Sequence, residues 1–203
     1  MQLSETAPGA VGSLVVVAVS AGGVGDLLAL VGLLPPDLDA AVIVVQHRSS
    51  GRDSKMADLL SRRTRLGVAE AVDGGRLEAG HVYLAPPDEH LVVDRLGLTI
   101  LNHDLKVHYV RPSADVLFES AAIHYGSRVL ALVLSGSGSD GASGVRAVKR
   151  AGGRVLVQDP ATAQFANMPL AAIETGCTDE VLSPADLATA VAAWSRRAPI
   201  AGR

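Results

Sequence analysis

Three polar residues of a kind that can catalyse acyl transfer each follow an apolar, strand-like stretch of this 203-residue chain. Ser20 follows the first stretch, His47 follows the second, and Asp140 lies in a glycine-rich turn after a later one. Serine can attack a carbonyl carbon, histidine can take the serine proton, and aspartate can orient the histidine and stabilise its charged form. In an open parallel sheet, the residues after neighbouring strands gather at one edge, where ligands bind. The pattern therefore predicts a Ser-His-Asp catalytic triad.

Each of these residues also has a purely structural interpretation. Ser20 alone can equally well cap the helix that follows it. His47 alone is more often a hydrogen-bonded structural histidine than a catalytic base. Asp140 can be the N-cap of a helix over 141–151, and this role is compatible with catalysis because a helix N-terminus favours an ionised carboxylate. It is their joint placement after three strands that favours catalysis.

The residues that follow the first strand, SAGGVG at 20–25, also invite comparison with a phosphate-binding turn. They match neither the G-x-G-x-x-G pattern nor the Gly-Lys-Ser/Thr ending of a P-loop. The second strand ends in Gln46 and His47 instead of the acidic residue that would bind a ribose. The G-x-S-x-G turn of many hydrolases is absent too, because Ala18 replaces its first glycine.

No cofactor or metal ion is expected from the sequence. The histidines besides His47 show neither H-x-x-x-H nor H-E-x-x-H spacing, so they give little support to a zinc site. We assign no role to these five residues, which are His81, His90, His103, His108 and His124.

Strand-like and helix-like patterns alternate along most of the chain. Strands are expected at 13–19, 40–46, 80–86, 128–135, 154–159 and 179–183, and a hairpin at 90–101. Helices are expected at 24–34, 54–63, 112–126, 140–153, 169–175 and 184–194, with Ser113 as an N-cap and Gly126 after a C-terminus. This alternation predicts one α/β domain at 13–198, in which helices cover a parallel sheet, preceded by a flexible lead-in at 1–12.

The composition excludes several classes of protein. The formal net charge is -3, which gives no electrostatic reason to expect a nucleic-acid partner. Cys177 is the single cysteine, so the chain cannot form an internal disulfide and fits a reducing compartment. No apolar run approaches the roughly 18 residues that span a bilayer, and the first residues lack the positive region of a secretory signal. We expect a cytoplasmic protein that does not insert into a membrane.

Six stretches together resemble, in order, the catalytic domain of the chemotaxis receptor methylesterase, CheB. They are VAVSAGG, VVQHRSSG, GHVYLAPPDEHL, RPSADVLFESAA, LVLSGSGSDGASGV and ANMPLAAIETG. The resemblance implies a three-layer α/β fold with a mostly parallel sheet and helices on both faces. It also implies hydrolysis of glutamate γ-methyl esters on the cytoplasmic domain of chemoreceptors, often with deamidation of receptor glutamines. The family's nucleophile, base and carboxylate fall on Ser20, His47 and Asp140.

The chain departs from the family pattern beside its nucleophile and before its aspartate. Ala21 stands where the family usually has threonine, and Ser137 stands where it has a methionine whose backbone N–H lies in the oxyanion hole. A backbone donor survives a change of side chain, so Ala21, Ser137 and Gly138 are the expected residues that bind substrate and oxyanion. Two alternatives remain open, which are a catalytically silent module that docks on a receptor or signalling partner and an esterase for another substrate.

The chemotaxis enzyme usually carries a receiver domain before its esterase domain, whereas here only residues 1–12 precede the first strand. The chain is therefore either a stand-alone member of the family or a fragment of a longer one, and the initial methionine favours the first. A separate signalling regulator is a candidate partner of a stand-alone member.

Overall fold

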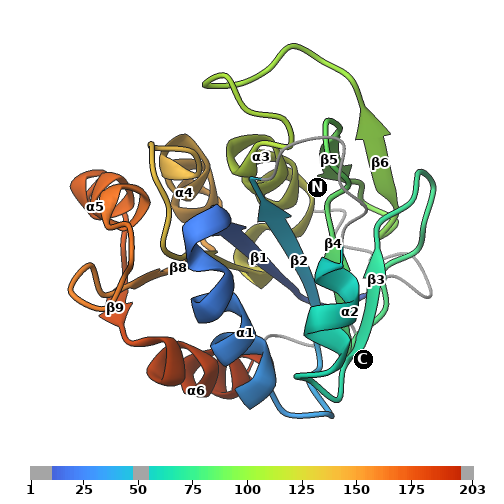
Figure 1. The fold of residues 1–203 in the computed structure, drawn as a ribbon. Helices are drawn as coiled ribbons and strands as arrows, with labels where there is room; N and C mark the ends of the chain where they lie inside the picture. The colour runs from blue at the N-terminus through green and yellow to red at the C-terminus, as the bar shows by residue number, and fades with distance from the viewer. Residues whose placement is uncertain (1–10, 48–54, 198–203) are drawn as a thin grey trace.

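A computed structural model describes residues 11–47 and 55–197, which form a seven-stranded parallel sheet with helices on both of its faces (Figure 1). In spatial order the strands are β3 (Gly67–Glu70), β4 (His81–Leu84), β2 (Ala41–Gln46), β1 (Leu14–Val19), β7 (Val129–Val133), β8 (Arg154–Gln158) and β9 (Glu180–Leu182). A separate antiparallel hairpin consists of β5 (His90–Val93) and β6 (Thr99–Asn102). The helices are α1 (Val24–Leu33), α2 (Met56–Ser61), α3 (Ala114–Tyr125), α4 (Ala142–Arg150), α5 (Asn167–Glu174) and α6 (Pro184–Ser195), with short 3-10 turns η1 (Ala21–Gly23) and η2 (Gly126–Arg128).

The central strands are apolar throughout because both of their faces are buried. In β1, Val15 and Val17 belong to the core beneath α1 and α6, whereas Val16 and Ala18 belong to the core beneath α3 and α4. Neighbouring side chains of a strand point to opposite faces, so one strand supplies both cores. The expected three-layer α/β architecture is confirmed.

The sheet places the three candidate strands next to one another. β1 pairs with β2 on one side and with β7 on the other, and Val19 lies opposite Gln46 in the first pair. Since all three strands run in the same direction, their carboxyl ends share one edge. The residues that follow β1, β2 and β7 therefore lie close together in space.

Helices α3 and α4 pack closely side by side over one face of the sheet (Figure 1). A Cβ atom on Gly144 of α4 would lie 2.5 Å from Phe118 Cβ of α3, so only glycine permits this approach. The N-terminus of α3 is in this way brought beside the turn that leads from β7 into α4.

Most of the expected elements are present, and one strand was missed. β3 is a four-residue edge strand whose side chains are half-buried or exposed, so it lacks the apolar run that marks the central strands. Residues 1–10 of the predicted lead-in, Ser54 of the predicted helix over 54–63 and residue 198 at the predicted domain end lie outside the described residues. Val11 is buried, and the Gly12 carbonyl accepts a hydrogen bond from Arg128.

Candidate active site

The structure joins two of the three predicted catalytic residues directly. His47 Nε2 and Asp140 Oδ2 lie 2.7 Å apart, although 93 residues separate them in the sequence. Asp140 is 4% exposed and His47 is 15% exposed. The carboxylate is thus shielded from water, while the imidazole retains a path to solvent.

Ser20 lies directly after β1, beside His47 and the end of β7. Its backbone N–H donates to the Ser135 carbonyl, and the His47 N–H donates to the Val19 carbonyl. The parallel ladder therefore continues one residue beyond each strand and keeps Ser20 and His47 in adjacent positions. The chain then turns at once into η1, with Ser20 still in an extended conformation.

Glycines at the ends of β1 and β7 allow the chain to pack tightly around Ser20. A Cβ atom on Gly136 would lie 2.8 Å from Ser20 Cβ, and one on Gly23 would lie 2.5 Å from the Ser135 carbonyl oxygen. A Cβ atom on Gly22 would come within 2.2 Å of the Phe165 ring. The serine is thus held between two turns that leave no room for a side chain at these positions.

Asp140 accepts hydrogen bonds from four donors, and three of them come from the start of α3. Its Oδ1 accepts from Ser113 Oγ at 2.6 Å and from the Asp115 N–H at 3.1 Å. Its Oδ2 accepts from the Ala114 N–H at 2.6 Å as well as from His47. Burial alone would raise the pKa of Asp140, but the hydrogen bonds from His47, Ser113 and Ala114 hold it below the usual value. The side chain is thus kept ionised and fixed in orientation.

The alternative structural interpretation of Asp140, an N-cap for the helix that follows it in the chain, does not describe its contacts. Its carboxylate accepts from the first N–H groups of α3, and Gly141 is the N-cap of α4. Ser113 occupies the predicted N-cap position of α3, but its hydroxyl donates to Asp140 and caps no backbone group. Gly126 follows the end of α3 with a φ of 56°, as expected for a residue after a helix.

A second buried carboxylate, Asp115, completes an exchange between the two helices. The Gly144 N–H in the first turn of α4 donates to Asp115 Oδ1 at 2.7 Å. The N-terminus of α3 therefore faces the carboxylate of Asp140, which precedes α4, and the first turn of α4 faces the carboxylate of Asp115 in α3. Burial raises the pKa of Asp115 to about 6, and repulsion by Asp140 adds to the rise, while the Gly144 hydrogen bond and His108 oppose it.

His90, for which no role was predicted, supports the same network. It is 1% exposed on β5. Its Nδ1 accepts from the Ser113 N–H at 3.2 Å, and its Nε2 lies 3.2 Å from the Leu105 carbonyl. His90 thereby positions the serine that holds Asp140. Its position at the start of a predicted hairpin strand gave no indication of this role.

The residues expected to bind substrate line the turns around Ser20. Ala21 follows Ser20 in η1, and Ser137 and Gly138 are exposed in the turn between β7 and Asp140. Gly138 has a φ of 93°, a backbone conformation that residues other than glycine rarely adopt. The backbone of this turn passes from contact with Ser20 at Gly136 to the carboxylate at Asp140.

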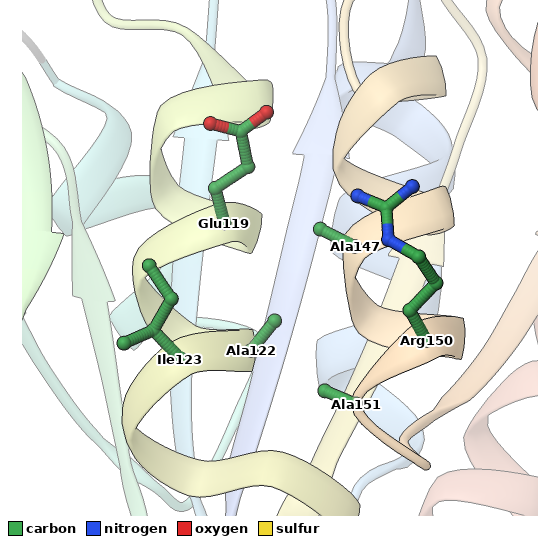
Figure 2. Close-up of a pocket in the computed structure, with 6 residues that line it drawn as sticks. All are labelled: Glu119, Ala122, Ile123, Ala147, Arg150 and Ala151. Carbon is green, nitrogen blue, oxygen red and sulfur yellow. The ribbon is translucent and has the colours of Figure 1, made fainter.

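A groove of about 500 Å³ lies elsewhere, between α3 and α4 beyond their first turns. Figure 2 shows its lining residues, which are Glu119, Ala122, Ile123, Ala147, Arg150 and Ala151. None of the predicted catalytic residues lines it.

Neither a metal site nor a membrane span is found in the described part of the chain. No three of its His, Cys, Asp and Glu side chains are grouped so that they could hold a metal ion. None of its helices is both long and apolar enough to cross a membrane.

Comparisons with known proteins agree with the observed fold. The sequence model of the CheB methylesterase family matches residues 15–191. A relative from Anaeromyxobacter dehalogenans, named protein-glutamate methylesterase/protein-glutamine glutaminase 2, is 44% identical over 168 residues, which cover 83% of this chain and 49% of that protein. A relative from Leptospira interrogans is 36% identical over 169 residues, which cover 83% of this chain and 88% of that protein.

A solved structure is similar as well. The crystal structure of the Thermotoga maritima CheB methylesterase catalytic domain matches with a TM-score of 0.86 at 34% identity, covering 90% of this chain and 98% of that one. The chain thus spans nearly all of a solved catalytic domain but about half the length of the Anaeromyxobacter relative.

Proposed function

Because this chain belongs to the CheB methylesterase family, we propose that it hydrolyses glutamate γ-methyl esters on the cytoplasmic domain of a chemoreceptor. Its catalytic triad is Ser20, His47 and Asp140. The observation that carries the proposal is the 2.7 Å contact between His47 and the buried carboxylate of Asp140, beside Ser20. We also propose that the protein acts in the cytoplasm, with the receptor as its substrate.

The first step forms an ester between the substrate glutamate and Ser20. A carboxylate only accepts hydrogen bonds, so His47 Nε2 carries the hydrogen shared with Asp140, and Nδ1 is the nitrogen left to act as base. Ser20 Oγ attacks the γ-carbonyl carbon as its proton passes to Nδ1. When the tetrahedral intermediate collapses, the methoxy oxygen takes that proton and leaves as methanol.

The second step releases the glutamate. Water attacks the ester carbon of the acylated Ser20 while His47 takes one of its protons. The Ser20 oxygen then leaves and recovers that proton from His47, which returns the enzyme to its starting state. The freed glutamic acid loses its remaining proton to solvent and becomes a carboxylate. Asp140, held ionised by its other donors, stabilises the imidazolium in both steps.

The negative charge on the tetrahedral oxygen needs donors that are already in place. We assign this role to the backbone N–H groups of Ala21 and of the turn at Ser137 and Gly138. The tight packing of Gly136 on Ser20 keeps that turn close to the nucleophile. Donors fixed by backbone do not depend on a threonine or methionine side chain, which supports activity in spite of the two departures from the family pattern.

The test is methanol release from a methylated receptor cytoplasmic fragment. The wild type should release methanol, and Ser20→Ala should lose nearly all of that activity with an unchanged melting temperature. Ser61→Ala is the matched control, because Ser61 is an exposed serine on α2 that contacts no predicted catalytic residue. A wild type that binds the fragment without releasing methanol would favour the silent docking module, and substantial turnover by Ser20→Ala would place the nucleophile elsewhere.

Deamidation is the second reaction to examine, because the Anaeromyxobacter relative is also named a protein-glutamine glutaminase. The same attack on a glutamine side chain would expel ammonia in place of methanol. Ammonia release from an unmethylated fragment that carries glutamine should be lost in Ser20→Ala together with methanol release. If Ser20→Ala lost methanol release but kept ammonia release, or the reverse, the two reactions would not share Ser20 as their nucleophile.

A further inference from the structure

The arm between β6 and α3 carries two large apolar side chains that contact almost nothing. Leu105 is 91% exposed and Tyr109 is 96% exposed. Figure 1 shows that this arm leaves β6, stands away from the body of the domain and returns to it at the start of α3. A single exposed apolar residue is ordinary on a protein surface, but here two large ones project from the same short arm and almost all of their surface faces solvent.

The tip of the arm is a tight turn that points Tyr109 outward. Val107 and Val110 exchange two backbone hydrogen bonds around it. The two residues between them, His108 and Tyr109, have φ values of 48° and 64°. This is the conformation of the turns that join adjacent strands, and it is unusual for residues with side chains.

Arg111 ties the base of the arm to the domain. Its Nη1 donates to the carbonyls of His103 and Asp104 at 2.8 and 3.0 Å. Its Nε and Nη2 both donate to Asp88 Oδ1, at 3.2 and 3.0 Å. The arm is therefore ordered before any partner binds, which lowers the entropy lost on docking.

The arm stands beside the proposed catalytic residues. The Leu105 carbonyl contacts His90, which accepts from Ser113, and Ser113 holds Asp140. At the tip, His108 Nε2 lies 3.7 Å from Asp115 Oδ2. The arm is thus linked to Asp140 through His90, Ser113 and Asp115, and its two exposed apolar side chains project from a segment anchored beside the site.

We propose that Leu105 and Tyr109 dock the polypeptide that carries the methyl ester, by contacting an apolar side chain of that polypeptide near the modified glutamate. This inference rests on the proposed function. An ester of a small molecule would lie within reach of Ser20 alone and would gain nothing from a projecting apolar tip. A polypeptide extends past the ester, and its apolar side chains can be buried against an aromatic tip of the kind enriched at interfaces.

The test compares a large substrate with a small one. The double variant Leu105→Ala/Tyr109→Asn removes both apolar side chains, and asparagine tolerates the positive φ at position 109. We expect its KM for the methylated receptor fragment to rise by about tenfold or more, as for the loss of an interface anchor. Its kcat/KM for p-nitrophenyl acetate should stay within about twofold of the wild type, because that ester is too small to reach the arm.

Two further variants serve as controls. Ile123→Ala removes an apolar side chain that is 76% exposed on α3 in the groove of Figure 2. It should change neither the KM for the fragment nor the kcat/KM for p-nitrophenyl acetate. Tyr109→Phe keeps the aromatic ring and should keep the wild-type KM for the fragment.

Each other outcome overturns the inference in a recognisable way. An unchanged KM for the fragment in the double variant, with an active wild type, would refute the docking role alone. An equal fall of kcat/KM for both substrates would show that the arm acts on the triad through His90 or Asp115. A wild type that releases no methanol from the fragment would refute the proposed function, and the docking role with it.

Discussion

The buried carboxyl of Asp115 should make the protein less stable as the pH rises through about 6. Burial raises its pKa from 3.8 to about 6, so the folded protein binds this proton more tightly than the unfolded chain does. Between these two values the folded state holds more protons, and its free energy of unfolding therefore falls as the pH rises. A shift of about two pKa units corresponds to a loss of at most about 3 kcal/mol, complete above about pH 6.

Asp115→Asn isolates this contribution. The amide oxygen can still accept from the Gly144 N–H, and no charge is then buried beside Asp140. We expect the stability of the variant, relative to wild type, to increase by up to about 3 kcal/mol between pH 4 and pH 7.5. Urea unfolding of both proteins at several pH values measures this difference, and the contributions of carboxyls that do not interact with Asp115 cancel from it.

Asp37→Asn is the control, because it makes the same change of side chain at an exposed position. A stability difference between Asp115→Asn and wild type that does not change with pH would mean that Asp115 does not carry a raised pKa. A variant that becomes relatively less stable as the pH rises would mean that the ionised carboxylate stabilises the fold, through His108 or Gly144, by more than its burial costs.

Other variants test the carboxylate and the glycine beside the nucleophile. Asp140→Asn should lower kcat for methanol release by about 10³- to 10⁴-fold, because an amide cannot fix the histidine tautomer or stabilise its charge. Ser113→Ala removes one of the four hydrogen bonds to Asp140 and should lower kcat by only about tenfold. Gly136→Ala should displace Ser20, lowering both kcat and the melting temperature. Gly25→Ala should lower neither, because nothing lies within 4 Å of a Cβ atom there.

The apolar runs and the polar residues that follow them were sufficient to predict which residues meet at the carboxyl edge of the sheet. Strands buried on both faces are recognisable as unbroken apolar runs, and a parallel sheet gathers their carboxyl ends. The structure accordingly brings His47 to Asp140 and keeps it beside Ser20. The short edge strand β3 was not predicted, because half of its residues are exposed and it has no apolar pattern.

The residues that hold Asp140 could not be predicted from local patterns. From a sequence, a capping residue is predicted only for the helix that directly follows it in the chain. Asp140 instead caps α3, which begins 26 residues before it. That exchange depends on the close approach of α3 and α4 at Gly144. The support of Ser113 by His90 likewise depends on how the β5–β6 hairpin packs beside α3.

Labelling with a fluorophosphonate tests most directly whether Ser20 is the nucleophile, because the reagent transfers its phosphonyl group to an activated serine and releases fluoride. We expect one phosphonyl group per chain, located on Ser20 by tandem mass spectrometry, and no labelling in His47→Ala. The neighbouring serines at 135, 137 and 139 provide an internal comparison within the same site. A label on one of those serines, or labelling of Ser20 at an undiminished rate in His47→Ala, would contradict the triad.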